Sequence, residues 1–206
     1  MKRLYLLRHG QTEFNVKKLV QGRCDSPLTD LGRQQARAAA AWLKAHGVAP
    51  DKVVSSPLGR AMDTASLVAC ELLGPDAAVE PCKGIIERCY GTFEEGPHDV
   101  LPTDVWDPGE DLVPFGGEGS KALQERMVAT LTNIMGSEGI ETLLAVSHGS
   151  ASRQFIKAAA PEGFELPAKL PNCAIMIFDF DDAREEDDAP QCKFTLQQIV
   201  DPQQSH

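Results

Sequence analysis

The chain has 206 residues, of which 42% are hydrophobic and 24% are charged, and its formal net charge is −10. This size and composition suit one globular domain, residues 1–206, with a core large enough to need no structural metal or disulfide. The negative charge argues against nucleic acid or an anionic membrane as the main partner, because both are negatively charged themselves.

Cysteine usage and the N-terminus favour a cytoplasmic protein. The six cysteines form no C-x-x-C pair, and their spacing suits no zinc site. Residues 1–3 are followed by a short apolar run that ends at Arg8, too soon for the core of a signal peptide, and no stretch is long enough to span a bilayer. We therefore expect reduced thiols in the cytoplasm.

The pattern of apolar and turn residues predicts an alternation of strands and helices. Thr29 is a plausible N-cap and Gly47 a plausible C′ residue for one helix, and Pro57 fits the first position of the next. In chain order the prediction is a strand at 4–7, a helix between 29 and 47, a strand at 51–56, a helix at 58–73, a short strand at 78–81, a helix at 121–135, a strand at 141–147, a helix at 151–160, and strands at 174–180 and 193–200. The polar stretch 11–27 is expected to be a loop. This order favours the α/β class, a three-layer α/β/α fold with a mostly parallel central sheet.

Two segments interrupt this pattern. Residues 94–119 contain four prolines, five glycines and eight acidic residues, with no lysine or arginine. We expect a lid-like insertion with little regular structure, because long loops in compact domains are usually functional or disordered. Residues 181–190 are acidic and are expected to form a solvated hairpin loop between the last two strands.

Two histidines stand out because each follows a predicted buried strand and precedes a glycine. His9 follows the strand at 4–7, and His148 follows the strand at 141–147. Ligands of open α/β sheets bind at the carboxyl ends of the strands, so the two imidazoles are expected to face one crevice. Taken alone, each histidine has a second interpretation as an ordinary hydrogen-bonded loop residue.

Two arginines are expected at the same edge of the sheet. Arg8 precedes His9, and Arg60 opens the helix after the second strand. Guanidinium groups bind phosphate oxygens bidentately and stay charged at any working pH, so this set predicts a site for a tetrahedral dianion. Arg60 alone could equally be a surface residue paired with Asp63 or Asp51.

The chain resembles the histidine phosphatase superfamily, whose fold is that of phosphoglycerate mutase. The resemblance lies in blocks of residues that follow the order of the family over residues 4–150, with a further match at the strand that begins near residue 170. These blocks are Leu7-Arg8-His9-Gly10-Gln11-Thr12 with Asn15, Gly22, Pro27-Leu28-Thr29, Gly32 and Gln35-Ala36; Ser55-Ser56-Pro57-Leu58 with Arg60-Ala61 and Thr64-Ala65; Glu87 with Gly91 and Glu95-Gly96; Ser147-His148-Gly149; and Leu170-Pro171-Asn172-Cys173.

The resemblance implies a role for each matched residue. His9 would be the nucleophile that forms a phosphohistidine. Arg8, Arg60 and His148 would hold the phosphoryl oxygens, and Asn15 would add a neutral donor. Glu87, otherwise an ordinary surface glutamate, would protonate the leaving oxygen and then activate water. No metal or other cofactor is expected, because the arginines supply the positive charge.

The family contains phosphatases and mutases, and several features favour a phosphatase. Cys89 replaces a histidine of the mutase pattern, residues 91–96 resemble the phosphatase branch, and the lid lacks the arginine pair with which mutases hold a substrate carboxylate. Residues 116–120 resemble the Gly-Gly-Glu-Ser block of the family with one residue inserted. The acidic lid is expected to repel a carboxylate on the leaving group. Three aromatic residues of this region could wall the leaving group or simply anchor the loop: Phe93, Trp106 and Phe115.

The sequence therefore predicts a metal-independent phosphomonoester hydrolase that acts through a phosphohistidine on His9. Its expected partner is a small phosphorylated metabolite, and a homodimer is left open. A cofactor-dependent phosphoglycerate mutase is the first alternative. A non-catalytic module that binds a phosphorylated ligand is the second, and it has no need for an acid such as Glu87.

Overall fold

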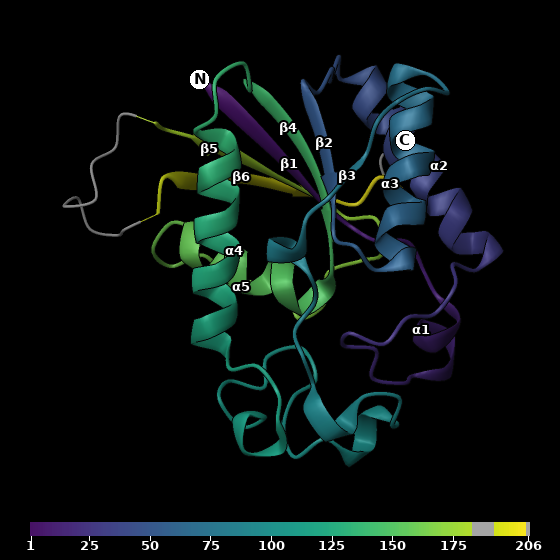
Figure 1. The fold of residues 1–206 in the computed structure, drawn as a ribbon, viewed down its shortest axis with the longest axis vertical. Coiled ribbons are helices and arrows are strands. Elements are labelled where there is room, and N and C mark those ends of the chain that lie inside the picture. The colour runs from purple at the N-terminus through teal and green to yellow at the C-terminus, as the bar shows by residue number, and fades with distance from the viewer. Residues whose placement is uncertain (183–191, 205–206) are drawn as a thin grey trace.

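A six-stranded sheet runs through the centre of the molecule in the computed structural model, which describes residues 1–182 and 192–204 (Figure 1). Its strands are β1 Lys2–Arg8, β2 Lys52–Ser55, β3 Glu80–Pro81, β4 Thr142–Ser147, β5 Ile175–Phe180 and β6 Phe194–Val200, in the order β3-β2-β4-β1-β5-β6. The first four strands of that order are parallel, and β5 is antiparallel to both of its neighbours. The sheet is mostly parallel, as predicted.

Four long helices cover the two faces of the sheet. Helices α2 Asp30–Ala45 and α3 Gly59–Leu73 pack on one face, and α4 Ser120–Met135 and α5 Gly149–Ala159 pack on the other (Figure 1). Successive side chains of a strand point to opposite faces. In β1, Leu4 and Leu6 accordingly join the core under α4 and α5, whereas Tyr5 and Leu7 join the core under α2 and α3. The predicted three-layer α/β/α fold is confirmed.

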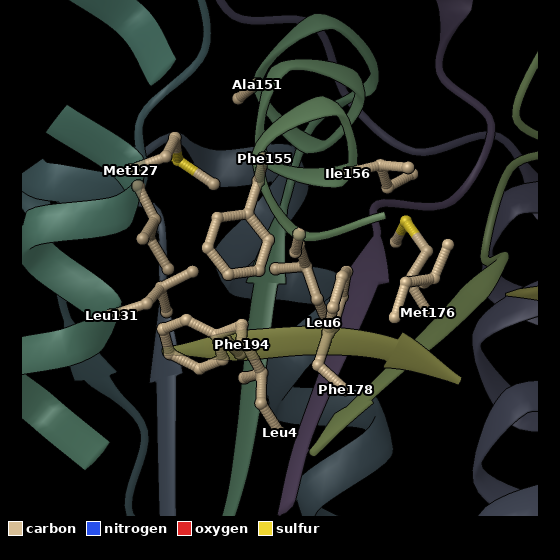
Figure 2. Packing of buried hydrophobic residues seen from close by; sticks show 14 of the residues in the cluster. Leu4, Leu6, Met127, Leu131, Ala151, Phe155, Ile156, Met176, Phe178 and Phe194 are labelled. Carbon is tan, nitrogen blue, oxygen red and sulfur yellow. The ribbon is translucent and has the colours of Figure 1, made fainter. Parts of the chain in front are cut away.

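Phenylalanines occupy the centre of the core beneath α4 and α5. The ring of Phe155 meets the rings of Phe178 and Phe194 edge to face, with centroids 4.8 Å and 5.0 Å apart. Figure 2 shows Phe155 pointing from α5 toward the sheet, between the side chains of α4 and those of β1. Edge-to-face pairs of this kind add to the free energy gained by burying the rings. This packing holds α5 against β5 and β6.

Most helix boundaries follow the predicted caps, with two exceptions. The hydroxyl of Thr29 accepts the N–H of Gly32, and Gly47 has a φ of 68° just after α2, so both predicted caps are confirmed. Pro57 is not the first residue of α3, which begins at Gly59 because the carboxylate of Asp25 accepts the N–H groups at its start.

The second exception is a short helix that the sequence analysis missed. Helix α1, Glu13–Lys17, lies inside the expected loop 11–27. Thr12 and Asn15 form a reciprocal capping box that supports this single turn. The usual third-position partner in such a box is Glu or Gln, so Asn15 gave a weaker signal in the sequence.

The long insertion and the acidic loop complete the chain. Residues 94–119 contain single 3₁₀ turns at His98–Val100 and Val113–Phe115, in line with the expected irregular structure. From residue 183 onward the predicted acidic hairpin loop lies outside the described residues, although the strands on either side of it, β5 and β6, pair antiparallel. Within the described part of the chain, no helix is long and apolar enough to cross a membrane.

Candidate active site

The parallel pairing of β1 with β4 brings the two strand-end histidines together. Arg8 lies opposite Ser147 in the register, and the N–H of His9 donates to the carbonyl of Ser147 at 3.0 Å. His9 and His148 follow these strands directly, and their ring centroids are 5.1 Å apart at an angle of 61°. Both side chains are buried. The structure thus places the two histidines at one point on the carboxyl edge of the sheet.

His9 is held as a neutral imidazole with one nitrogen available. Its Nδ1 lies 2.7 Å from the carbonyl oxygen of Gly10. A carbonyl can only accept, so Nδ1 carries the proton and Nε2 keeps its lone pair. Burial lowers the pKa of His9 well below its ordinary value, and the charges of Arg60 and Arg8 lower it further. A neutral imidazole with a free lone pair is the form that a nucleophile requires.

His148 is fixed in a different way, through Ser56. Its Nε2 lies 2.7 Å from the hydroxyl of Ser56, whereas its Nδ1 is buried with no partner among the described residues. Burial lowers the pKa of His148 well below its ordinary value, and the charges of Arg60, His9 and Arg8 lower it further. The sequence analysis assigned no role to Ser56. Its position just after β2, at the same sheet edge, was the only sequence signal for one.

Arg8 and Arg60 are both buried, and each is fixed while keeping one N–H free. Arg8 donates from Nη1 to the carbonyl of Leu170, and Arg60 donates to the carbonyls of Gly22 and Cys24 at 2.7 Å. The Nε of each arginine is buried and has no partner among the described residues. Burial lowers the pKa of Arg8 to about 10, so the group is still a cation at neutral pH.

Asp25 holds Arg60 in place, and the sequence analysis did not single it out. Its Oδ1 lies 3.2 Å from Nη1 of Arg60 and 3.3 Å from the backbone nitrogen of the same residue. Its Oδ2 accepts the N–H of Gly59. One carboxylate therefore caps α3 and anchors the guanidinium. The alternative partners considered from the sequence, Asp51 and Asp63, do not form this ion pair.

Glu87 lies at the N-terminal end of α5, against the helix dipole. Its carboxylate accepts the N–H of Ala151 at 2.8 Å and that of Ser150 at 3.2 Å, as well as the N–H of Arg88 at 2.8 Å. These are first-turn donors of a helix, where negative charge is favoured. The negative charge of Glu87 also raises the pKa of Arg8 and of Arg60 against the effect of burial, so it acts on both guanidiniums.

These groups surround a cavity of about 300 Å³. Asn15 reaches it with its amide oriented, because its Oδ1 accepts from the N–H of Thr12 and from Asn172, which leaves Nδ2 as the remaining donor. His148 contacts His9 and is fully buried beside the cavity. The described residues that line it include Arg8, His9, Asn15, Lys18, Arg60, Glu87, Tyr90, His98, Val105, Trp106, Ser150, Lys169 and Asn172.

Comparison with known proteins identifies the family of this chain. The model of the histidine phosphatase superfamily (branch 1) matches residues 4–188. The chain belongs to the histidine phosphatase superfamily.

Relatives of this chain include both phosphatases and mutases. A broad-specificity phosphatase of Saccharomyces cerevisiae is 32% identical over 162 residues, which cover 75% of this chain and 69% of that protein. A probable phosphoglycerate mutase of Proteus mirabilis is 31% identical over 186 residues, 87% of this chain and 86% of that protein. A crystal structure of phosphoserine phosphatase from Entamoeba histolytica, in complex with phosphoserine, superposes with a TM-score of 0.74 at 27% identity and covers 98% of both chains. The chain is thus a member of an enzyme family.

The insertion of residues 94–119 closes one side of the cavity. Trp106 lines the cavity, and its ring centroid lies 5.0 Å from the guanidinium carbon of Arg8. A Cβ on Gly149 would come within 2.6 Å of this indole, so only a glycine permits the close approach. Arg88, fully buried, ties the insertion to the site by donating to the carbonyl of Glu118 at 2.7 Å and to the hydroxyl of Ser150 at 2.8 Å.

The structure separates the two interpretations that the sequence left open for the three aromatic residues. Trp106 lines the cavity, but Phe93 and Phe115 do not. These two rings meet each other edge to face at 4.9 Å, and Phe93 packs against the small cluster of Val20, Tyr90 and Leu112. Their role in the folded chain is to anchor the insertion.

The expected negative lining of the lid is also wrong. None of the eight acidic residues of 94–119 lines the cavity. Glu94 accepts the N–H groups of Arg23, Cys24 and Tyr90, and Glu118 pairs with Arg126 at 2.8 Å. Their charges are used to hold the insertion to the body of the protein. Among the described residues, the charged side chains at the mouth of the cavity are lysines.

Metal ligands are a separate question from phosphate binding. The described residues contain no group of three or more His, Cys, Asp or Glu side chains placed to hold a metal ion. Positive charge at the site is supplied by buried side chains, above all Arg8 and Arg60.

We expect Asp25→Asn to weaken the site without unfolding the protein. The substitution keeps one acceptor oxygen but removes the charge that holds Arg60. Hydrogen bonds to charged groups contribute about 1–2 kcal/mol at a partly exposed position, so kcat/KM should fall roughly 5- to 30-fold. Steady-state kinetics with an aryl phosphate measure this. Asp30→Asn, which removes an exposed ion pair with Arg33, is the matched control. Equal kinetics for the two variants would contradict the role given to Asp25.

The low pKa of His9 predicts a pH dependence of stability. Between its ordinary pKa of about 6.5 and its lower value in the folded protein, the unfolded chain binds a proton there that the folded chain does not. The free energy of unfolding therefore falls as the pH falls through this window. His9→Asn removes the effect, so stability should drop by about 1 kcal/mol less than in the wild type between pH 7.0 and 5.5.

Urea denaturation in phosphate-free buffer measures this difference. Phosphate must be absent because an anion bound beside His9 would favour its protonated form. If the wild type and the variant lose the same stability over this range, His9 is not held neutral as the structure indicates.

Proposed function

We propose that this chain is a phosphomonoesterase that acts through a phosphohistidine on His9, with a small phosphorylated metabolite as substrate. One observation carries the proposal. Three buried polar atoms that have no partner among the described residues, Nε of Arg8, Nε of Arg60 and Nδ1 of His148, belong to the groups around a neutral His9. Buried polar groups normally have partners, so their absence here indicates a ligand. A phosphoryl group supplies oxygens that can accept from all three side chains when Nδ1 of His148 carries a proton.

The first step transfers the phosphoryl group to the protein. The lone pair of Nε2 on His9 attacks phosphorus, and the bond from phosphorus to the ester oxygen breaks. Arg8, Arg60 and Asn15 hold the phosphoryl oxygens while negative charge builds on them. Glu87, in its protonated form, gives its proton to the leaving oxygen, and the alcohol departs.

The second step returns the protein to its starting state. Glu87, now a carboxylate, takes a proton from a water molecule, whose oxygen attacks the phosphorus of the phosphohistidine. The bond from phosphorus to Nε2 breaks, and inorganic phosphate leaves. His9 is again neutral because its Nδ1 stays bonded to the carbonyl of Gly10 throughout. The yeast and Entamoeba relatives, both named phosphatases, support hydrolysis as the net reaction.

The phosphoglycerate mutase is the second candidate, because a 31% identical relative carries that name. Both reactions begin with the same phosphohistidine. They differ in whether water or a phosphoglycerate hydroxyl receives the phosphoryl group. Residues 94–119 contain no lysine or arginine, so the insertion lacks the arginine pair of the mutase pattern, and this favours hydrolysis.

His9→Ala should abolish turnover and leave the fold intact. Removal of a nucleophile typically costs several orders of magnitude in kcat. With a ³²P-labelled substrate, the wild type stopped in alkali during turnover should retain label on the protein, and the variant should retain none. Alkali is required because phosphohistidine is labile in acid. His46→Ala, at the exposed end of α2, is the control and should keep both activity and label. Label on the His9→Ala protein would assign the nucleophile to another residue.

The choice between hydrolysis and transfer is tested with 3-phosphoglycerate. We expect release of inorganic phosphate to exceed formation of 2-phosphoglycerate, because water can reach the phosphohistidine through the open mouth of the cavity. Both products are quantified in the same reaction, with and without added 2,3-bisphosphoglycerate. Isomerisation faster than phosphate release would replace the phosphatase proposal with the mutase.

A further inference from the structure

Two lysines line the mouth of the active-site cavity, and the mechanism proposed above uses neither. Lys18 is the residue that ends α1, with a φ of 55°, and its carbonyl accepts the N–H of His98 in the insertion at 3.1 Å. Lys169 precedes Leu170, whose carbonyl accepts from Arg8. The two lysines therefore come from separate segments that are both attached to the site through their backbones, and their side chains reach one cavity.

Neither ammonium group has a negative partner. Lys18 and Lys169 form no ion pair with any carboxylate in residues 1–182 and 192–204. Two carboxylates of the insertion, Glu94 and Glu118, bind Arg23 and Arg126 instead. Both lysines act on the same neighbour, because the positive charges of Lys169 and Lys18 add to the effect of burial in lowering the pKa of His98.

Trp106 links this second group of cations to the phosphoryl site. The Nζ of Lys169 lies 5.8 Å from the centroid of the indole ring, and the guanidinium carbon of Arg8 lies 5.0 Å from it. The ring of Trp106 thus lies within 6 Å of Arg8, which would hold the phosphoryl group, and of Lys169, which would not. A substrate with its phosphoryl group on His9 would extend its leaving group past this ring toward the lysines.

The charge balance of the site also needs an explanation. The protein carries a net charge of −10, yet the described residues that line this cavity include four cationic side chains against one carboxylate, that of Glu87. The cations are Lys18, Lys169, Arg8 and Arg60. A phosphoryl dianion matches the two buried arginines. The two further cations in the same cavity repel one another and the arginines unless a second anion is bound. Lysine suits a compact anionic group at a solvent-exposed position, because its ammonium is a mobile point charge.

We propose that Lys18 and Lys169 form a second anion-binding subsite, which selects phosphomonoesters whose leaving alcohol carries a further anionic group such as a carboxylate or a second phosphate. The inference rests on the proposed function, since it identifies the leaving-group end of the same substrate. The acidic sequence of the insertion led to the opposite expectation, that a carboxylate on the leaving group would be repelled. The subsite distinguishes substrates by the charge at their far end and takes no part in the bond-breaking step.

The test compares substrates that differ in the second anion alone. The first pair is 3-phosphoglycerate and glycerol 3-phosphate, in which a carboxylate is replaced by a hydroxymethyl group. The second pair is fructose 1,6-bisphosphate and fructose 6-phosphate, which tests a second phosphate. The measured quantity is the ratio of kcat/KM within each pair. We expect at least one ratio to exceed one in the wild type and to shrink with added salt, because ionic interactions at exposed positions are screened. The pair with the larger ratio identifies which anion the subsite prefers.

Variants assign the preference to the two lysines. Lys18→Gln and Lys169→Gln should each lower the preferred ratio about three- to tenfold, as expected for one partly exposed ionic contact. Lys169→Glu should lower it further by placing a like charge beside the anion. Lys17→Gln is the matched control, because Lys17 is exposed, adjacent to Lys18 and absent from the cavity lining, and its ratio should stay within about twofold of the wild type. Thermal melting confirms that each variant is folded.

Binding to an inactive protein separates this proposal from the proposed function. In His9→Ala, the thermal shift produced by 3-phosphoglycerate should exceed that produced by glycerol 3-phosphate, and Lys169→Gln in the same background should remove the difference. This readout needs no turnover, so it tests the subsite even if the wild type released no phosphate from any substrate, a result that would overturn the phosphatase alone. Two results would overturn the subsite. One is a ratio at or below one in both substrate pairs, and the other is a ratio that stays unchanged in Lys18→Gln, Lys169→Gln and Lys169→Glu.

Discussion

The parallel pairing of β1 with β4 is the constraint on which the site depends. Both strands are buried on both faces, which requires nearly continuous apolar runs and leaves their polar ends at one edge of the sheet. The register that sets Arg8 opposite Ser147 also sets His9 beside His148. A shift of one residue would turn the side chains of a strand to the other face of the sheet. The burial of Leu6 and Leu7 in opposite cores therefore also determines where the imidazoles lie.

Around the two histidines the protein holds two positively charged guanidiniums in a buried position, where charged groups are unfavourable. Burial of Arg8 and Arg60 is unfavourable for their charged forms, as the lowered pKa values indicate. Backbone carbonyls and the carboxylate of Asp25 offset part of this cost and fix the two heads. The Nε of each guanidinium has no partner among the described residues. The result is a site organised in advance for an anion, with little rearrangement needed on binding.

The same charges keep the histidines neutral. Arg60 and Arg8 lower the pKa of both imidazoles in addition to the effect of burial, and the carbonyl of Gly10 sets the tautomer of His9. Glu87 is placed by a third element, the N-terminal end of α5, so the carboxylate that we propose as proton carrier is independent of the strands that lead to His9 and His148. Three different structural devices thus position His9, the two arginines and Glu87. Each relies on backbone groups, which move less than side chains.

The acidic insertion shows that charge composition does not by itself define a surface. Residues 94–119 contain eight acids and no lysine or arginine, which suggested a negative lid. In the folded chain Glu94, Glu118 and Asp107 bind backbone N–H groups or cations of the surrounding elements. Their charge is used for attachment, and the cavity mouth is left to Lys18 and Lys169. A carboxylate acts electrostatically on a ligand only where it points toward that ligand.

The sequence alone determined whatever depends on neighbours along the chain. The strand-His-Gly pattern at His9 and His148, the cap at Thr29 and the order of strands and helices are local signals that predicted the fold and placed two histidines and two arginines at one sheet edge. The resemblance of several sequence blocks to one family added Glu87, and the structure brings it together with Arg8, His9, Arg60 and His148. Only the tertiary structure decided which distant residues support that set. Asp25 on Arg60, Ser56 on His148 and the two lysines at the cavity mouth are contacts between segments far apart in the chain. No local pattern encodes such contacts, because they depend on how the packed layers bring the loops together.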